Sequence, residues 1–187
     1  MTVPTMNADT GDAPLPQITQ TESSVFGELY LRHATPVYRY IYVRVGQAQV
    51  AEDLTAETFL AAYTSLSTYR EQGKFAGWLM GIARNLVADH FRAHKADLSL
   101  DALSEQPRGQ PTPEETVGLQ MEIEHLRRAM QALTDEQAEV VRLRMFAELD
   151  TSETAHLMGK SEAAVKMLLH RALRALRQQM QRQEETR

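Results

Sequence analysis

The stretch EAAVKMLLHRALRALR, residues 162–177, combines apolar and basic side chains at helical spacing. Its apolar residues recur at positions that place them on one face of an α-helix. They are Val165, Leu168, Leu169, Ala172, Leu173 and Leu176. The other face is basic and carries Lys166, His170, Arg174 and Arg177, with Arg171 at its edge. The stretch therefore predicts a helix that packs by one face and presents cations on the other.

The residues of this helix alone leave three interpretations open. An amphipathic helix with a solvated basic face is the simplest of them, and it needs no partner. A helix lying on a membrane surface would carry similar charge, but this stretch lacks the Trp and Phe side chains that favour such a site. The third interpretation is a helix whose basic face contacts nucleic acid.

The residues just before this helix favour the nucleic-acid interpretation. Asp150 and Glu153 predict an N-terminal cap for a short helix that covers Ser152–Met158. The tight link Gly159-Lys160-Ser161 follows, and its serine is expected to cap the next helix. Two helices joined in this way form a helix-turn-helix, in which the second helix enters the major groove of DNA.

In such a motif the first turns of the second helix reach the edges of the bases. Lys166 and His170 are placed for that role. Arg171, Arg174 and Arg177 are expected to lie near phosphates. The C-terminal part of the chain is therefore predicted to read duplex DNA through this helix.

A second long helix is predicted over GKFAGWLMGIARNLVADHFRAHK, residues 73–95. Its apolar stripe is expected to face a core and contains Phe75, Trp78, Leu79, Ile82, Ala83, Leu86 and His90. The opposite stripe joins small residues to polar and basic ones: Gly77, Gly81, Arg84, Asn85, Ala88, Arg92 and Lys95. Small residues allow close approach, and cations can follow a nucleic-acid backbone. A solvated face is the alternative interpretation of these cations.

Almost every periodic segment has helical spacing, and no convincing strand pattern is present. The sequence therefore predicts an all-α fold of two small helical domains joined by a flexible linker. The domains are expected over residues 24–96 and 112–180, with an acidic linker over 97–111. Residues 1–23 are expected to form a disordered tail and residues 181–187 a C-terminal tail.

Local signals predict where individual helices begin and break. In the first domain, helices are expected over residues 25–45 and 49–66, and Pro36 should kink or restart the first of them. In the second domain, Thr112 and Thr134 each begin a capping sequence. The helix after Thr134 is expected to run to about Phe146.

The charge of the chain is unevenly distributed. The net charge is −5, but residues 1–28 hold four acidic side chains and no Lys or Arg, and residues 97–124 hold seven acidic side chains against Arg108. The remaining segments are therefore net positive, which is compatible with a polyanionic partner. The chain has no cysteine, no signal-peptide pattern and no apolar run long enough to span a bilayer. A cytoplasmic location without membrane insertion is expected.

Two clusters of titratable residues have spacings that could form a chemical site. Glu52, Asp53 and Glu57 share a helix face, but no partner histidine or nucleophile suggests catalysis. A solvated acidic face or a docking surface for a basic partner is expected instead. His90 and His94 are one helical turn apart, but no carboxylate completes a zinc motif. No catalytic residue, metal site or cofactor is predicted.

In this order, three segments resemble the sigma factors of bacterial RNA polymerase, specifically the extracytoplasmic-function class. The segments are AEDLTAETFLAAYTSLSTYR (51–70), residues 73–95 and ALTDEQAEVVRLRMFAELDTSETAHLMGKSEAAVKMLLHRALRAL (132–176). The resemblance covers most of the chain outside the tail and linker. It implies a region 2 domain followed by a region 4 domain, without the region 3 domain of larger sigma factors.

The resemblance also implies partners and residue roles. Glu52, Asp53 and Glu57 would dock onto the β′ clamp helices of core polymerase, and region 4 would meet the β flap. Single-stranded DNA of the −10 element would be bound by Arg70, Gln72, Lys74, Arg84, Asn85, Arg92 and Lys95. The −35 element would be bound by Lys160, Ser161, Ala163, Ala164, Lys166, Met167, His170, Arg171 and Arg174. An anti-sigma factor is the expected controlling partner.

The second helix of the motif departs from the family pattern G-T-V-K-S-R-x-x-R-A-R. Ala163-Ala164 replaces Gly-Thr, Met167-Leu168 replaces Ser-Arg, and Leu173 replaces the last Arg. Because one bidentate base contact supplies ~1–3 kcal/mol of discrimination, the −35 preference cannot be transferred from typical members. Ala163, Ala164 and Met167 are hypothesised to contact thymine methyl groups.

Two other kinds of protein fit parts of the sequence. An autonomous helix-turn-helix repressor or activator would bind duplex DNA tightly without polymerase, usually as a dimer, and no dimer interface is evident. A helical adaptor that binds only proteins would show no dependence on DNA. The acidic docking surface and the second basic helix favour a promoter-specificity subunit.

Overall fold

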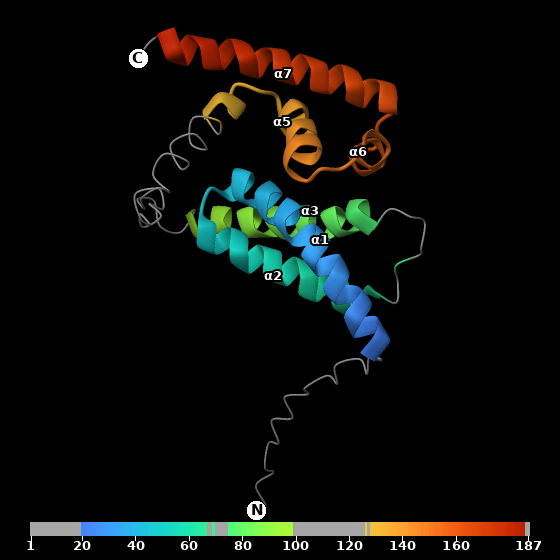
Figure 1. Ribbon diagram of the computed structural model, residues 1–187. Helices are drawn as coiled ribbons and strands as arrows, with labels where there is room; N and C mark the ends of the chain where they lie inside the picture. Colours follow the sequence, from blue (N-terminus) through green and yellow to red (C-terminus); the bar gives the residue numbers. More distant parts are fainter. Residues whose placement is uncertain (1–19, 67–68, 70–74, 99–125, 127, 186–187) are drawn as a thin grey trace, which may run out of the picture.

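The computed structural model describes residues 20–66, 69, 75–98, 126 and 128–185. Within these residues the chain is helical and contains no strand, as the sequence predicts. The helices form two layers, one from each half of the chain, with α7 lying across the outer side of the second layer (Figure 1). The predicted linker 97–111 lies almost wholly outside the described residues, as do the capping sequence at Thr112 and most of the helix expected after it.

The N-terminal layer consists of α1 (Gln20–Val45), α2 (Ala48–Thr64) and α3 (Phe75–Leu98). Helix α2 packs against both α1 and α3, and α1 also contacts α3. Helix α1 begins inside the segment expected to be a tail, and α3 ends beyond the domain boundary expected after residue 96. The buried residues at the centre of this layer include Val37, Ile41, Phe59, Leu79 and Val87.

Pro36 was expected to kink or restart the first helix, and a restart does not occur. Pro36 lies inside α1, which continues without interruption to Val45. A proline in a helix interior removes one backbone hydrogen bond and costs about 3 kcal/mol. The turn directly after it buries Val37, Tyr40 and Ile41 almost completely, and this burial outweighs the local loss.

The C-terminal layer contains α5 (Asp135–Val141), the π-helical segment η2 (Arg142–Phe146), α6 (Thr151–Met158) and α7 (Glu162–Glu185). Helix α7 packs on α5 and α6. The helix expected to run to Phe146 does so, but its end is π-helical, with the amide of Ala147 donating to the carbonyl of Arg142 over 2.9 Å. Helix α7 continues through most of the segment expected to be the C-terminal tail.

Both predicted capping boxes of this layer are present. The side chain of Thr134 accepts from the amide of Gln137, and that of Asp150 accepts from the amide of Glu153 over 2.7 Å. In each case the side chain of the third helical residue returns a bond to the cap. These local bonds satisfy amides that the helix itself leaves free.

Each layer contributes buried residues to the core of the other, and Val43 of α1 is buried with the C-terminal core. Leu143, Ala147 and Leu149, which belong to η2 and the residues after it, are buried with the core of α1, α2 and α3. Helix α3 also packs against α6. At the edge of this contact, Glu148 has a left-handed backbone (φ 57°) and its carboxylate pairs with Arg39 of α1 over 3.1 Å. The halves are therefore joined by apolar packing as well as by the chain.

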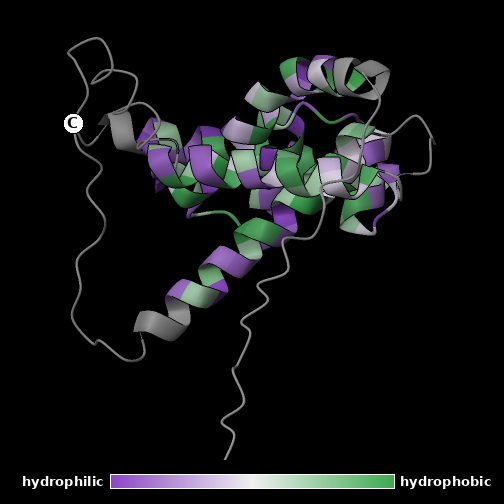
Figure 2. Cartoon of the chain, turned by 90° about the horizontal axis from the view of Figure 1, so that it is seen from below, coloured by the Kyte–Doolittle hydropathy of each residue, from purple (hydrophilic) through white to green (hydrophobic). Residues whose placement is uncertain are grey.

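Hydrophilic and hydrophobic residues are interspersed along the helices (Figure 2). Consistent with that pattern, none of the helices in the described residues is both long enough and apolar enough to cross a membrane.

Candidate nucleic-acid interface

The helix-turn-helix predicted from the sequence is formed by α6 and α7. Gly159 closes α6 in the left-handed conformation (φ 64°), where a side chain would be strained. Lys160 and Ser161 complete the turn, and the hydroxyl of Ser161 accepts from the amide of Ala164 over 3.2 Å. Ser161 therefore caps α7 as expected, and the turn fixes the direction in which α7 leaves α6.

The buried face of α7 is narrower than the sequence pattern suggests. Val165, Ala172 and Leu176 are buried, and Leu168 and Leu169 are partly buried against them. Leu173, expected on the same stripe, is 41% exposed. Position 173 lies at the margin of the stripe, where the packing of α5 and α6 on α7 no longer covers it.

Most residues predicted to meet the −35 element are exposed along the other side of α7. The exposed members are Ser161, Ala163, Ala164, Lys166, Met167, His170, Arg171 and Arg174. They form a continuous surface over the first half of the helix. Each of these side chains is exposed to solvent, as contact with a DNA groove requires.

Lys160 is engaged with another side chain. Its ammonium group pairs with Glu136 of α5 over 2.7 Å. Beside this pair lies an apolar hollow of about 350 Å³, which Ala163, Ala164 and Met167 help to line. The first turns of α7 therefore present methyl and thioether groups next to its cations.

Gly77 and Gly81, in the first half of the small-residue stripe of α3, face the other layer. A Cβ atom added to Gly77 would lie 3.7 Å from Cβ of Glu153, and one added to Gly81 would lie 3.7 Å from Leu157. Both of these neighbours belong to α6. The two glycines therefore allow α6 to pack closely against α3.

Because of this contact, the residues predicted to bind the −10 strand differ in their exposure to solvent. Asn85 is exposed, and Arg92 is exposed and paired with Asp89. Arg84 is partly buried and donates to the carbonyl of Leu157 over 2.8 Å. Arg70, Gln72, Lys74 and the side chain of Lys95 lie outside the described residues.

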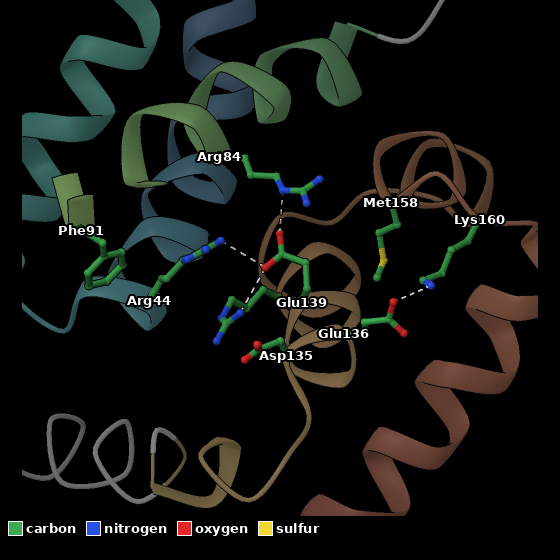
Figure 3. Close-up of a pocket in the computed structure, with 9 residues that line it drawn as sticks. Arg44, Arg84, Phe91, Asp135, Glu136, Glu139, Met158 and Lys160 are labelled. Carbon is green, nitrogen blue, oxygen red and sulfur yellow. Dashed lines mark hydrogen bonds and ion pairs between the residues drawn. The ribbon is translucent and has the colours of Figure 1, made fainter. Parts of the chain in front are cut away.

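A carboxylate that the sequence reasoning missed stands at the centre of the contact between the layers. Glu139 of α5 has a side chain only 11% exposed and is surrounded by donors (Figure 3). Its oxygens accept from the Tyr40 hydroxyl (2.9 Å), from Arg44 (3.2 Å) and from Arg142 (3.1 Å). Nε of Arg84 lies 3.6 Å from the same carboxylate.

The same cluster changes the pKa of the Tyr40 phenol. Burial, and after it the Glu139 carboxylate, raises the pKa of Tyr40 well above its usual value. The phenol is therefore neutral and serves as a donor to the carboxylate. A signal was present in the sequence, because Glu139 interrupts an otherwise apolar buried run of Ala138, Val140 and Val141.

The predicted docking residues share an exposed face of α2. Glu52, Asp53 and Glu57 are all exposed, and Leu60 on the same helix is 59% exposed. The carboxylate of Asp53 accepts from the Gln49 amide over 3.1 Å. Among the described residues, no group of three or more His, Asp or Glu side chains is arranged to hold a metal ion.

Comparison with known proteins identifies both halves of the chain. The family model for Sigma-70 region 2 matches residues 29–96, and the model for Sigma-70, region 4 matches residues 129–178. These ranges correspond to α1–α3 and to the layer that contains α5, α6 and α7.

Curated relatives are sigma factors as well. The chain is 42% identical over 158 residues to the ECF RNA polymerase sigma factor BldN of Streptomyces coelicolor, spanning 83% of this chain and 60% of that relative. It is 32% identical over 156 residues to the ECF RNA polymerase sigma factor SigM of Bacillus subtilis, spanning 80% of this chain and 91% of SigM.

A solved structure supports the fold. The sigma factor RpoE, in its complex with the anti-sigma factor NepR from Bartonella quintana, matches with a TM-score of 0.68 at 18% identity. The match covers 84% of this chain and 98% of RpoE. Together with the exposed helix-turn-helix and the two matched regions, these relationships show that the chain belongs to the ECF sigma factors of RNA polymerase.

Proposed function

We propose that this chain directs core RNA polymerase to promoters with −10 and −35 elements and assists in opening them. The observation that carries the proposal is the exposed face of α7, which follows a capped helix and a tight turn in helix-turn-helix order. Lys166, His170 and Arg171 on that face are the residues for reading the −35 element in the major groove.

Polymerase docking and −10 strand binding are assigned to two other surfaces, on α2 and on α3. The acidic face of α2 is the docking surface for the β′ clamp helices, where charge complementarity would guide association. Asn85 and Arg92, with Arg84 once it is released from Leu157, are the contacts for the unpaired −10 strand. Binding an unpaired strand more tightly than the duplex shifts the DNA toward the open form.

The setting follows from this role. From the polymerase partner we infer that the chain acts in the cytoplasm, as a transcription initiation factor with no catalytic site of its own. Because RpoE is seen bound to an anti-sigma factor, we also propose that an anti-sigma factor controls this chain. Such a partner would act by covering the same surfaces.

Run-off transcription tests the proposal directly. Core polymerase is assayed with and without the chain on a library of genomic promoter fragments. We expect new start sites that require the chain. If no start site is added, and the free chain instead binds duplex DNA tightly without polymerase, the chain is an autonomous DNA-binding regulator.

Substitution of the exposed cations of α7 tests the −35 assignment. Lys166→Ala and His170→Ala should each change the preferred −35 sequence, since one base contact supplies ~1–3 kcal/mol of discrimination. The measurement is selection from a promoter library randomised at the −35 element. Arg177→Ala, farther along the same helix, is the matched control and should weaken binding evenly across sequences.

A further inference from the structure

The contact between the two layers contains more arginine than one carboxylate requires. Three guanidinium groups, those of Arg44, Arg84 and Arg142, surround Glu139, and two of them come from the N-terminal layer. They line a cavity of about 490 Å³ that the side chains of Asp135, Glu136 and Lys160 also border. Lys160 is paired with Glu136, so the arginines around Glu139 supply the unmatched positive charge. Figure 3 shows Arg44 and Arg84 reaching the carboxylate from different directions.

Arginines arranged in this way bind anionic oxygens of several kinds. A guanidinium group donates to carboxylate and to phosphate with the same forked geometry. Arg44 and Arg84 belong to the layer that is proposed to bind single-stranded DNA, while Glu139 belongs to the opposite layer. In the structure, a carboxylate of region 4 therefore occupies the arginines of region 2.

We propose that Arg44 and Arg84 form a phosphate-binding site for nucleic acid, and that Glu139 masks this site and holds the free chain closed. This inference rests on the proposed function, because it takes the −10 strand as the source of the phosphate. The site adds Arg44 of α1 to the residues predicted to contact the −10 strand.

The remaining contacts make the masking effective. Arg84 is fixed at both ends of its guanidinium group, by Glu139 and by the carbonyl of Leu157. Helix α6 covers Gly77 and Gly81 on the same face of α3. A strand can follow that face only after α6 withdraws, and withdrawal breaks the bonds of Glu139 to Tyr40 and Arg44.

A disulfide staple tests whether the free chain is closed. Disulfides require Cβ atoms about 3.5–4.5 Å apart, and a Cβ at Gly77 would lie 3.7 Å from that of Glu153. The chain has no cysteine of its own, so the double variant Gly77→Cys/Glu153→Cys contains only the intended pair. Oxidation is followed by gel mobility, with and without reducing agent.

We expect rapid crosslinking within the monomer. The control pair is Gly27→Cys/Glu153→Cys, because a Cβ at Gly27 meets nothing within 4 Å, and it should remain reduced under the same conditions. Adding a mixed-sequence single-stranded oligonucleotide should slow crosslinking of the Gly77 pair. Failure of that pair to crosslink, or a crosslinking rate unchanged by the oligonucleotide, would overturn the proposal.

Binding of the same oligonucleotide tests the mask itself. Fluorescence anisotropy of a labelled strand should show that Glu139→Gln raises affinity at least about tenfold, as expected if the open form is at most about 10% populated. The matched control Glu162→Gln removes the same charge from the same layer, at an exposed position of α7 that does not line the cavity. It should raise affinity much less, and adding Arg44→Gln to Glu139→Gln should remove the gain.

The two sets of results separate the inference from the proposed function. Equal affinity of Glu139→Gln and Glu162→Gln, or of the oxidised and reduced staple, would exclude a masked site even if the chain supports transcription. The staple does not alter Glu139, so it remains informative if Glu139→Gln folds poorly. Conversely, a masked site in a chain that adds no start sites would disprove only the promoter function.

Discussion

The substitution Leu149→Ala is expected to lower the free energy of unfolding by about 2–5 kcal/mol, the usual range for replacing a buried leucine with alanine. Leu149 follows η2 in the C-terminal half, has no exposed surface and is buried with the core of the N-terminal layer. Its loss leaves a cavity between the layers. The effect should therefore reach residues of both halves.

The chain provides separate probes for this prediction. Trp78 is the only tryptophan and lies on α3, where it packs against Tyr69 and Phe75. Its fluorescence reports the N-terminal layer, and far-ultraviolet circular dichroism reports the helices of both. In urea, both signals of Leu149→Ala should shift together to lower concentration. The control Leu173→Ala, at an exposed position of α7, should change stability by less than about 0.5 kcal/mol.

Separate transitions for the two signals would contradict this prediction. If the Trp78 transition stays at its wild-type midpoint while the dichroism shifts, the two layers unfold independently. The shared cluster would then add little to the stability of the N-terminal layer.

Reversing the charge of Asp53 is expected to weaken association with core polymerase at least about tenfold, because like charges placed opposite one another cost several kcal/mol. Asp53 lies at the centre of the acidic face of α2 and bonds only to Gln49 among the contacts described above. Because the side chain is exposed, Asp53→Lys should leave the helices intact. Size-exclusion chromatography with core polymerase and run-off transcription measure the loss.

The matched control is Glu28→Lys, which makes the same reversal of charge at an exposed position of α1. It should associate with core polymerase much as the wild-type chain does. If Asp53→Lys binds as well as Glu28→Lys, the acidic face of α2 is not the docking surface.

Local sequence signals predicted local structure well. The caps at Thr134, Asp150 and Ser161 were confirmed because the partners of each bond lie within three residues along the chain. The prediction that the helix restarts at Pro36 was wrong for the opposite reason. The cost of a proline is local, but the burial that outweighs it depends on helices that pack against the next turn.

The candidate site shows the same division. The exposed face of α7 could be read from spacing, because the residues that bury its other face recur with the period of the helix. Gly77 and Gly81 correctly indicated close approach, but the sequence could not say that α6 was the neighbour. Likewise, neither the pairing of Lys160 with Glu136 nor that of Glu139 with Arg44 could be seen from residues so far apart in the chain.

The burial of Leu143 and Leu149 between the layers also affects the tendency of the protein to aggregate. Both side chains have no exposed surface while the layers are together. Separating the layers presents these leucines to water, and exposed apolar surface of this kind promotes aggregation unless another protein covers it. We therefore expect chain that opens without a partner to aggregate more readily than chain that stays closed.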